Sequence, residues 1–72
     1  MNVKKKELTF YAQEELEGGY IAWAEGHDIY TQADSWEELL EMIKDAVKCH
    51  FEDEDLPLFV HVHFIKDVTI KV

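Results

Sequence analysis

Residues 17–24 read Glu-Gly-Gly-Tyr-Ile-Ala-Trp-Ala, and this stretch decides how the first part of the chain folds. Gly18 and Gly19 accept positive φ without a Cβ clash, which a hairpin turn with a bulge often requires. The residues that follow are short, aromatic and β-prone. The stretch therefore predicts the returning arm of a β-hairpin, with a strand over residues 20–25.

The segments on either side of this hairpin turn supply two more strands. Residues 7–13 alternate, with Leu8, Phe10 and Ala12 on one side and polar or aromatic residues on the other. A period of two predicts a strand with one face on the core. Residues 26–28 form another turn, and residues 29–32 read as a third short strand. Three strands joined by short turns predict an antiparallel meander.

The next segment carries the signals of an amphipathic helix. Ser35 is a suitable N-cap, and Glu38 three residues later completes a capping-box pattern. Apolar and half-apolar side chains then recur at helical spacing, at Trp36, Leu39, Leu40, Ile43, Ala46, Val47, His50 and Phe51. Four acidic residues at 52–55 are unfavourable at a helix C-terminus, and Pro57 forces the preceding residue towards an extended conformation. We expect the helix to end near Glu52.

Residues 58–65 alternate again and predict a fourth strand without a fully polar face. After Lys66 and Asp67, alternation resumes at Val68, Ile70 and Val72. Lys-Asp is a poor two-residue hairpin turn. The sequence therefore favours a bend or bulge in one long strand over a separate fifth strand.

The predicted fold class is α+β, in the order β-β-β-α-β, as one domain over residues 1–72. One helix can cover only one face of a four-stranded sheet. The other face is expected to carry Thr9, Tyr11, Gln13, Phe59, His61, His63 and Ile65. Such a half-apolar surface is larger than a monomer normally leaves in water. We therefore expect a homodimer or higher homo-oligomer, or a partner protein.

The composition bears on what that partner is. Sixteen acidic and seven basic residues give a net charge of −9. This charge opposes direct binding to DNA or RNA, because affinity for phosphates depends on Lys and Arg. It suits a basic protein partner, whose approach it would steer, although acidity could equally serve only solubility.

The compartment is expected to be the cytoplasm. Lys4-Lys5-Lys6 resembles the basic start of a signal peptide, but Glu7, Thr9 and Gln13 interrupt any apolar run after it. The longest apolar run is far short of the roughly 20 residues of a membrane span. Cys49 is the only cysteine, which fits a reducing compartment.

The histidines and carboxylates of the sequence each allow a chemical and a structural interpretation. His61 and His63 lie two apart on a predicted strand and could bind one metal ion, with a third ligand from Cys49, His50 or a carboxylate. The alternative is a pair of half-buried histidines at an interface, and we expect no cofactor. The many carboxylates are expected to be solvated rather than catalytic, so the protein is predicted not to be an enzyme.

The predicted contact residues follow from alternation and helix angle. Tyr20 or Trp23 is expected to line a contact. The full set of predicted interface residues is Tyr11, Trp23, Phe59, His61 and His63, with Met42 and Cys49 behind them on a second strip of the helix.

Three motifs in order resemble the HicB antitoxin family. Residues 17–22, Glu-Gly-Gly-Tyr-Ile-Ala, match its hairpin motif D/E-x-G-G-Y-x-A. Residues 31–35 with Glu37 and Glu38 match the segment that leads into its helix, with Ala for Gly and Ser for Thr. Residues 42–46, Met-Ile-Lys-Asp-Ala, match the helix motif conservatively. The resemblance covers about residues 7–65, and residues 25–28 replace the family's usual proline-glycine loop.

The resemblance implies a partial ribonuclease H-like fold without the catalytic carboxylates. It implies a non-enzymatic antitoxin that binds and masks HicA, a small basic toxin that cleaves mRNA. Many HicB proteins continue into a DNA-binding domain, whereas this sequence shows none, so we expect no direct operator binding. The alternatives left open are another regulatory or structural role with a different protein partner, and a histidine-dependent metal-binding protein.

Overall fold

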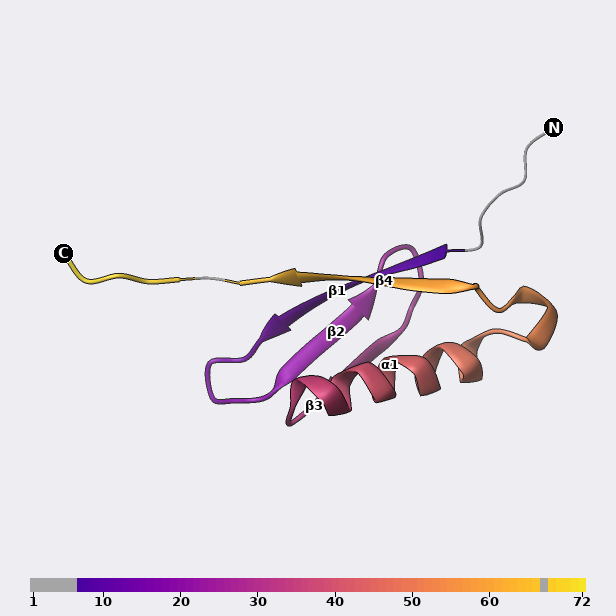
Figure 1. Cartoon of the computed structure of the whole chain (residues 1–72), viewed down its shortest axis with the longest axis horizontal. Coiled ribbons are helices and arrows are strands. Elements are labelled where there is room, and N and C mark those ends of the chain that lie inside the picture. The colour runs from indigo at the N-terminus through magenta and orange to yellow at the C-terminus, as the bar shows by residue number, and fades with distance from the viewer. Residues whose placement is uncertain (1–6, 67) are drawn as a thin grey trace, which may run out of the picture.

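Four strands and one long helix make up the fold of the protein in a computed structural model, which describes residues 7–66 and 68–72. The strands are β1 (Glu7–Glu14), β2 (Tyr20–Ala24), β3 (Tyr30–Ala33) and β4 (Phe59–Ile65). Helix α1 (Trp36–His50) and a 3-10 turn, η1 (Asp53–Asp55), lie between β3 and β4. The predicted α+β class and the order β-β-β-α-β are confirmed (Figure 1).

The sheet has the strand order β3-β2-β1-β4. The pairs β1–β2 and β2–β3 are antiparallel, which confirms the predicted meander. Strand β4 pairs with β1 in parallel, because α1 and η1 carry the chain back across the sheet before β4 begins. The sheet is therefore mixed, with β1 inside it and β4 at one edge.

The β1–β2 connection depends on its two glycines. Gly18 and Gly19 have φ values of 102° and 88°, in the left-handed region that favours glycine. The Gly18 N–H donates to the Glu15 carbonyl at 3.0 Å, and the Glu15 N–H donates to the Gly19 carbonyl at 2.9 Å. A Cβ on Gly19 would lie 3.1 Å from the Ala33 carbonyl oxygen. The positive φ favours glycine at position 19, and the close Ala33 carbonyl adds a steric penalty for any other residue.

Helix α1 begins and ends close to where the sequence predicts. The Glu38 N–H donates to Ser35 Oγ at 3.1 Å, and Glu38 Oε1 accepts from the Asp34 N–H at 3.2 Å. This reciprocal arrangement resembles a capping box, although the second donor lies one residue before the N-cap. Phe51 is the C-cap and is already extended, so the acidic run follows the helix rather than extending it.

The core lies between α1 and one face of the sheet. It is formed by Leu8, Phe10, Ala12, Ala22, Ala24, Ile29, Leu39, Ile43 and Val47. Helix α1 packs against β2 and β3, at the side of the sheet remote from β4. On the same face, Val60 and Val62 of β4 are therefore only half-buried, and Phe64 is exposed.

The expectation for the end of the chain is not met in either form. Strand β4 ends at Ile65, and residues 68–72 form neither an extension of it nor a fifth strand. Asp67, part of the predicted bend, lies outside the described residues. None of the four described strands pairs with residues 68–72, and pairing is what would define them as a strand. They run on beyond β4, away from α1 (Figure 1).

Candidate protein-interaction face

Among the described residues, no helix lies over the face of the sheet opposite α1 (Figure 1). Strand register places these side chains on that face, because directly paired residues point the same way. We call this surface the open face; it comprises Thr9, Tyr11, Gln13, Ile21, Trp23, Tyr30, Gln32, Phe59, His61, His63 and Ile65. Every residue predicted for the uncovered face is among them.

One rung of the open face is aromatic across all four strands. His63 of β4 pairs with Tyr11 of β1, Tyr11 with Trp23 of β2, and Trp23 with Tyr30 of β3. The ring centroids of Tyr11 and Trp23 lie 6.1 Å apart, and those of Tyr11 and His63 lie 5.7 Å apart. We call these four residues the aromatic row. They form a broad, shallow surface that is amphipathic from end to end.

Tyr11 is held in place by a hydrogen bond to the β2–β3 turn. Its hydroxyl donates to Glu25 Oε1 at 3.0 Å. This hydrogen bond and the negative charge of Glu25 favour the neutral phenol, so the pKa of Tyr11 is raised above its ordinary value of 10.0. The Glu25 N–H in turn donates to the Thr9 carbonyl at 2.8 Å. The turn is therefore fixed against β1, and it keeps the phenol oriented.

The rungs on either side of the aromatic row differ in character. At one end, His61 pairs with Thr9 and Phe59 pairs with Glu7. The paired residues of β2 and β3 do not extend to these positions, so only β1 and β4 form this end of the open face. Phe59 is 62% exposed. At the other end, Ile65, Gln13, Ile21 and Gln32 form a mixed apolar and amide rung.

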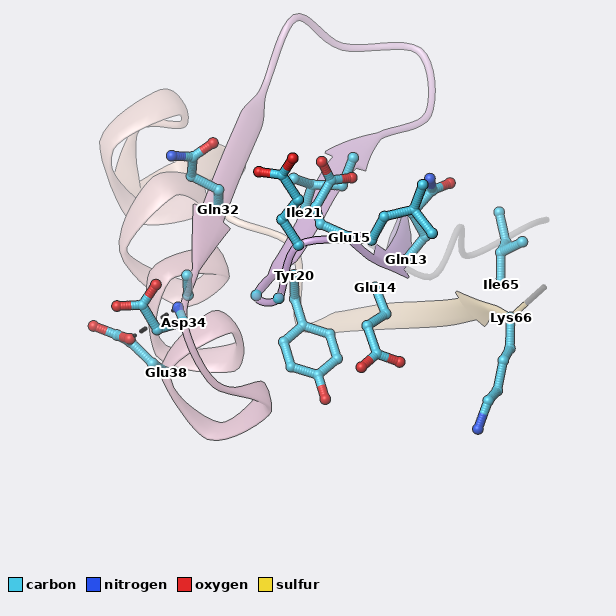
Figure 2. Close-up of a pocket in the computed structure, with 15 residues that line it drawn as sticks. Gln13, Glu14, Glu15, Tyr20, Ile21, Gln32, Asp34, Glu38, Ile65 and Lys66 are labelled. Carbon is cyan, nitrogen blue, oxygen red and sulfur yellow. Dashed lines mark hydrogen bonds between the residues drawn. The ribbon is translucent and has the colours of Figure 1, made fainter. Parts of the chain in front are cut away.

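That mixed rung opens into a concavity around the β1–β2 hairpin (Figure 2). Its lining includes the carboxylates of Glu14, Glu15, Glu17, Asp34 and Glu38, with Lys66 as the one basic side chain among the residues that line it. Figure 2 shows Glu15 on the same side as Gln13 and Ile21, whereas Glu14 and Tyr20 point the other way. Negative charge therefore surrounds this end of the sheet on both sides.

The structure divides the predicted contact residues into two groups. Tyr11, Trp23, Phe59, His61 and His63 share the open face. Met42 and Cys49 are exposed on α1, which lies on the other side of the sheet. The helix strip is therefore a separate surface rather than support for the first group.

The choice left open between Tyr20 and Trp23 is also resolved. Tyr20 packs on the helix side, with its ring centroid 5.7 Å from that of Trp36 and 6.4 Å from that of Phe64. Trp23 lies three positions further along β2 and therefore faces the opposite way. Only Trp23 belongs to the open face.

The sequence prediction missed Ile21, Tyr30 and Gln32, which belong to the open face. It also missed Glu25, which orients Tyr11. The alternation of β2 contained the signal for Ile21, since it lies two residues before Trp23. Tyr30 and Glu25 depend on the exact register across the β2–β3 turn, which the sequence does not fix.

The open face holds two histidines without a third metal ligand nearby. His61 and His63 project from the same face of β4. Among residues 7–66 and 68–72, no three His, Cys, Asp or Glu side chains converge as a metal site requires. Cys49 and His50, the proposed third ligands, lie on α1 at the other face of the sheet. His50 instead contacts His27 and Phe51, at centroid distances of 5.7 and 4.9 Å.

Comparison with known proteins identifies close relatives. A Thermotoga maritima protein named UPF0150 protein is 62% identical over 68 residues, which are 94% of this chain and 96% of the relative. An Archaeoglobus fulgidus protein of the same name is 52% identical over 54 residues, covering 75% of this chain and 82% of that protein. No protein-family model matches the chain. No solved structure matches it either. Within the described residues, no helix is both long and apolar enough to cross a membrane.

Proposed function

The chain belongs to the UPF0150 family, and we propose that this member is a non-enzymatic protein-binding module that acts through its open face. In its specific form, the proposal is a HicB-like antitoxin of the cytoplasm that binds and masks a small basic HicA-type ribonuclease. The general form requires only that the open face dock a basic protein. The specific form adds the motif resemblance in residues 17–46.

The aromatic row is the observation that carries the proposal. Tyr and Trp are enriched at protein interfaces, where their large rings bury apolar area and their polar atoms form hydrogen bonds. Here His63, Tyr11, Trp23 and Tyr30 span the full width of a sheet face that no other described element covers. Tyr30 is 61% exposed even though it is a strand residue. A partner surface laid across this row would bury all four rings together.

The charge of the protein favours a basic partner. The net charge is −9, and five carboxylates surround the concavity at the hairpin end of the open face. A complementary positive surface would be steered towards this end before docking. Arg and Lys side chains would then meet the faces of Trp23 and the tyrosines, where cation–π contact is favourable. The same charge opposes an RNA or DNA ligand.

A binding experiment with a HicA-type ribonuclease tests the specific form. The wild-type chain is expected to bind the toxin and suppress its mRNA cleavage. Trp23→Ala removes the central ring of the row and is expected to weaken binding about thirtyfold or more, as hot-spot truncations do. Met42→Ala, on the exposed side of α1, is the matched control and should bind as the wild type does. Circular dichroism checks that both variants are folded.

Two results would count against the proposal at different levels. If the ribonuclease neither binds nor is inhibited, the antitoxin role is wrong. Affinity purification with wild-type, Trp23→Ala and Met42→Ala chains then tests the general form. A basic protein retained by the wild type and Met42→Ala but lost by Trp23→Ala would support a different regulatory or structural role. Equal retention by all three chains would show that the open face is not the binding surface.

A further inference from the structure

Strand β4 has one edge whose backbone is not paired with any described strand. Among the described residues its only hydrogen-bonded neighbour is β1, so its outer backbone N–H and C=O groups have no strand beside them. Natural edge strands are usually shortened, or blocked by Pro or Lys. The other edge, β3, has only four residues, whereas β4 has seven and contains neither Pro nor Lys. The β4 edge therefore lacks the usual protection against association.

The residues after β4 have the alternating pattern of a β-strand but pair with none of the described strands. Residues 68–72, here called the C-terminal arm, place Val68, Ile70 and Val72 at alternate positions with Thr69 and Lys71 between them. The three apolar side chains are 72%, 75% and 112% exposed. The arm runs beyond the end of β4, away from the rest of the domain (Figure 1). Within the part of the chain that the structure describes, nothing buries this apolar stripe.

Strand β4 has a matching apolar stripe on its helix-side face. Val60 and Val62 are half-buried and Phe64 is 40% exposed, because α1 packs mainly over β2 and β3. The helix reaches β4 through Trp36, whose ring centroid lies 5.2 Å from that of Phe64. The arm cannot reach its own β4 without a reversal at residues 66–67, and Lys-Asp is a poor hairpin turn. A second copy of the chain can present its arm to this edge without any reversal.

We propose that two copies of this chain form a two-fold dimer in which the C-terminal arm of each pairs antiparallel with the β4 edge of the other. A two-fold axis makes the two contacts identical and sets the strands antiparallel. The two four-stranded sheets then join into one continuous sheet. Each arm gains backbone partners, and each free β4 edge is covered.

Side-chain chemistry selects the register of this pairing. An axis at residue 66 would set two Lys66 side chains directly opposite each other, and like charges in that position are destabilising. Moving the axis to Ile65 removes this conflict, because Ile65 then meets its own copy. The same register sets Ile70 opposite Val60 and Val68 opposite Val62. Apolar residues thus meet apolar residues at these two pairs and at the axis, whereas Lys66 falls opposite Phe64.

The polar residues of the arm fit this register too. Thr69 falls opposite His61, and Lys71 falls opposite Phe59, at the start of β4. The acidic turn η1, residues 53–55, lies just before that start. The positive charge of Lys71 is thereby brought to the most acidic segment of the partner copy. The contact is made along the backbone edge of β4 rather than across the aromatic row, so the inference goes beyond the proposed function and does not depend on it.

Mass measurement with matched arm variants is the first test. Light scattering or sedimentation should give the wild type about twice the 8.5 kDa of one chain. Ile70→Asp places a charge in the apolar stripe and should raise the dimer dissociation constant about tenfold or more. Thr69→Asp adds the same charge on the opposite side of the arm and should change it far less. Both positions lie outside the folded core, so neither variant should unfold the domain.

Cross-linking is the second test and checks the register. In a Cys49→Ser background, Val60→Cys with Ile70→Cys should form an intermolecular disulfide on oxidation. Val60→Cys with Thr69→Cys is the control, and it should cross-link poorly because the two thiols point to opposite faces. A monomeric wild type at high concentration would overturn the proposal. So would equal effects of the two Asp variants, or a dimer that Trp23→Ala dissociates and Ile70→Asp does not.

Discussion

At the scale of single residues, Tyr11 has more partners than any other residue of the open face. It contacts Trp23 on one side and His63 on the other, and its hydroxyl is bound by Glu25. The ring therefore links three strands and one turn. The hydrogen bond of its hydroxyl holds the Tyr11 ring in one orientation. Such preorganisation lowers the entropy cost of binding a partner.

The hydrogen bond of Tyr11 gives a prediction at alkaline pH. Its raised pKa means that the neutral phenol stabilises the folded state. This contribution is fully present below the ordinary tyrosine pKa of 10.0 and is lost as the pH rises through the raised value. Ultraviolet titration should therefore show a tyrosine ionisation above pH 10.0 that Tyr11→Phe removes. Glu25→Ala should bring that step down, whereas Glu17→Ala, in the β1–β2 turn, should leave it in place.

A titration in which Tyr11→Phe removes an ordinary step and leaves the late one would contradict this assignment. The stability difference between the wild type and Tyr11→Phe supplies a second check. It should narrow as the pH rises through the upper titration. A difference that widened with pH would mean that the charged phenolate, not the neutral phenol, is favoured in the folded chain.

At the scale of elements, the start of α1 depends on one side chain. Ser35 Oγ accepts the Glu38 N–H, an otherwise unpaired donor of the first turn. We expect Ser35→Ala to lower the free energy of unfolding by about 1 kcal/mol, measured by urea denaturation. Ser35→Asp keeps an acceptor at the same position and should remain within a few tenths of a kcal/mol of the wild type. Equal losses in both variants would show that the cap is not the cause.

The helix and meander could be predicted from sequence because their signals are local. The cap at Ser35, the glycines at 18 and 19 and the alternation of β1 each depend on neighbours a few residues away. The open face followed in large part from the same alternation. The parallel pairing of β4 with β1 and the place of Tyr30 in the aromatic row were not predictable in this way. Both depend on contacts between distant parts of the chain.

Residues 68–72 also show that sequence alternation does not determine which strands pair. Their alternation correctly marks a segment suited to β-pairing, but a strand exists only where a second strand provides hydrogen bonds. A pattern within one chain cannot state which chain supplies that partner. The prediction of an extended β4 was wrong for the described residues because none of the described strands pairs with residues 68–72.

At the scale of the whole molecule, the net charge of −9 acts on stability. Lys44 and Glu41 form an ion pair at 3.3 Å, and both side chains are largely exposed, so this pair adds little stability. Salt therefore screens much repulsion and little attraction. We expect the melting temperature to rise as NaCl increases from about 10 mM to about 200 mM. A sucrose series of equal osmolality controls for solute exclusion, and a falling melting temperature in NaCl would contradict the prediction.

The position of β1 inside the sheet has a consequence for the order of events during synthesis. Residues 7–14 leave the ribosome early, yet one of the two neighbours of this strand, residues 59–65, is made some fifty positions later along the chain. Until β4 is made, the β1 edge that will pair with it can pair instead with another extended segment. The sheet can therefore be completed only after nearly the whole polypeptide has been synthesised. Incorrect strand pairing is most favoured before β4 is made.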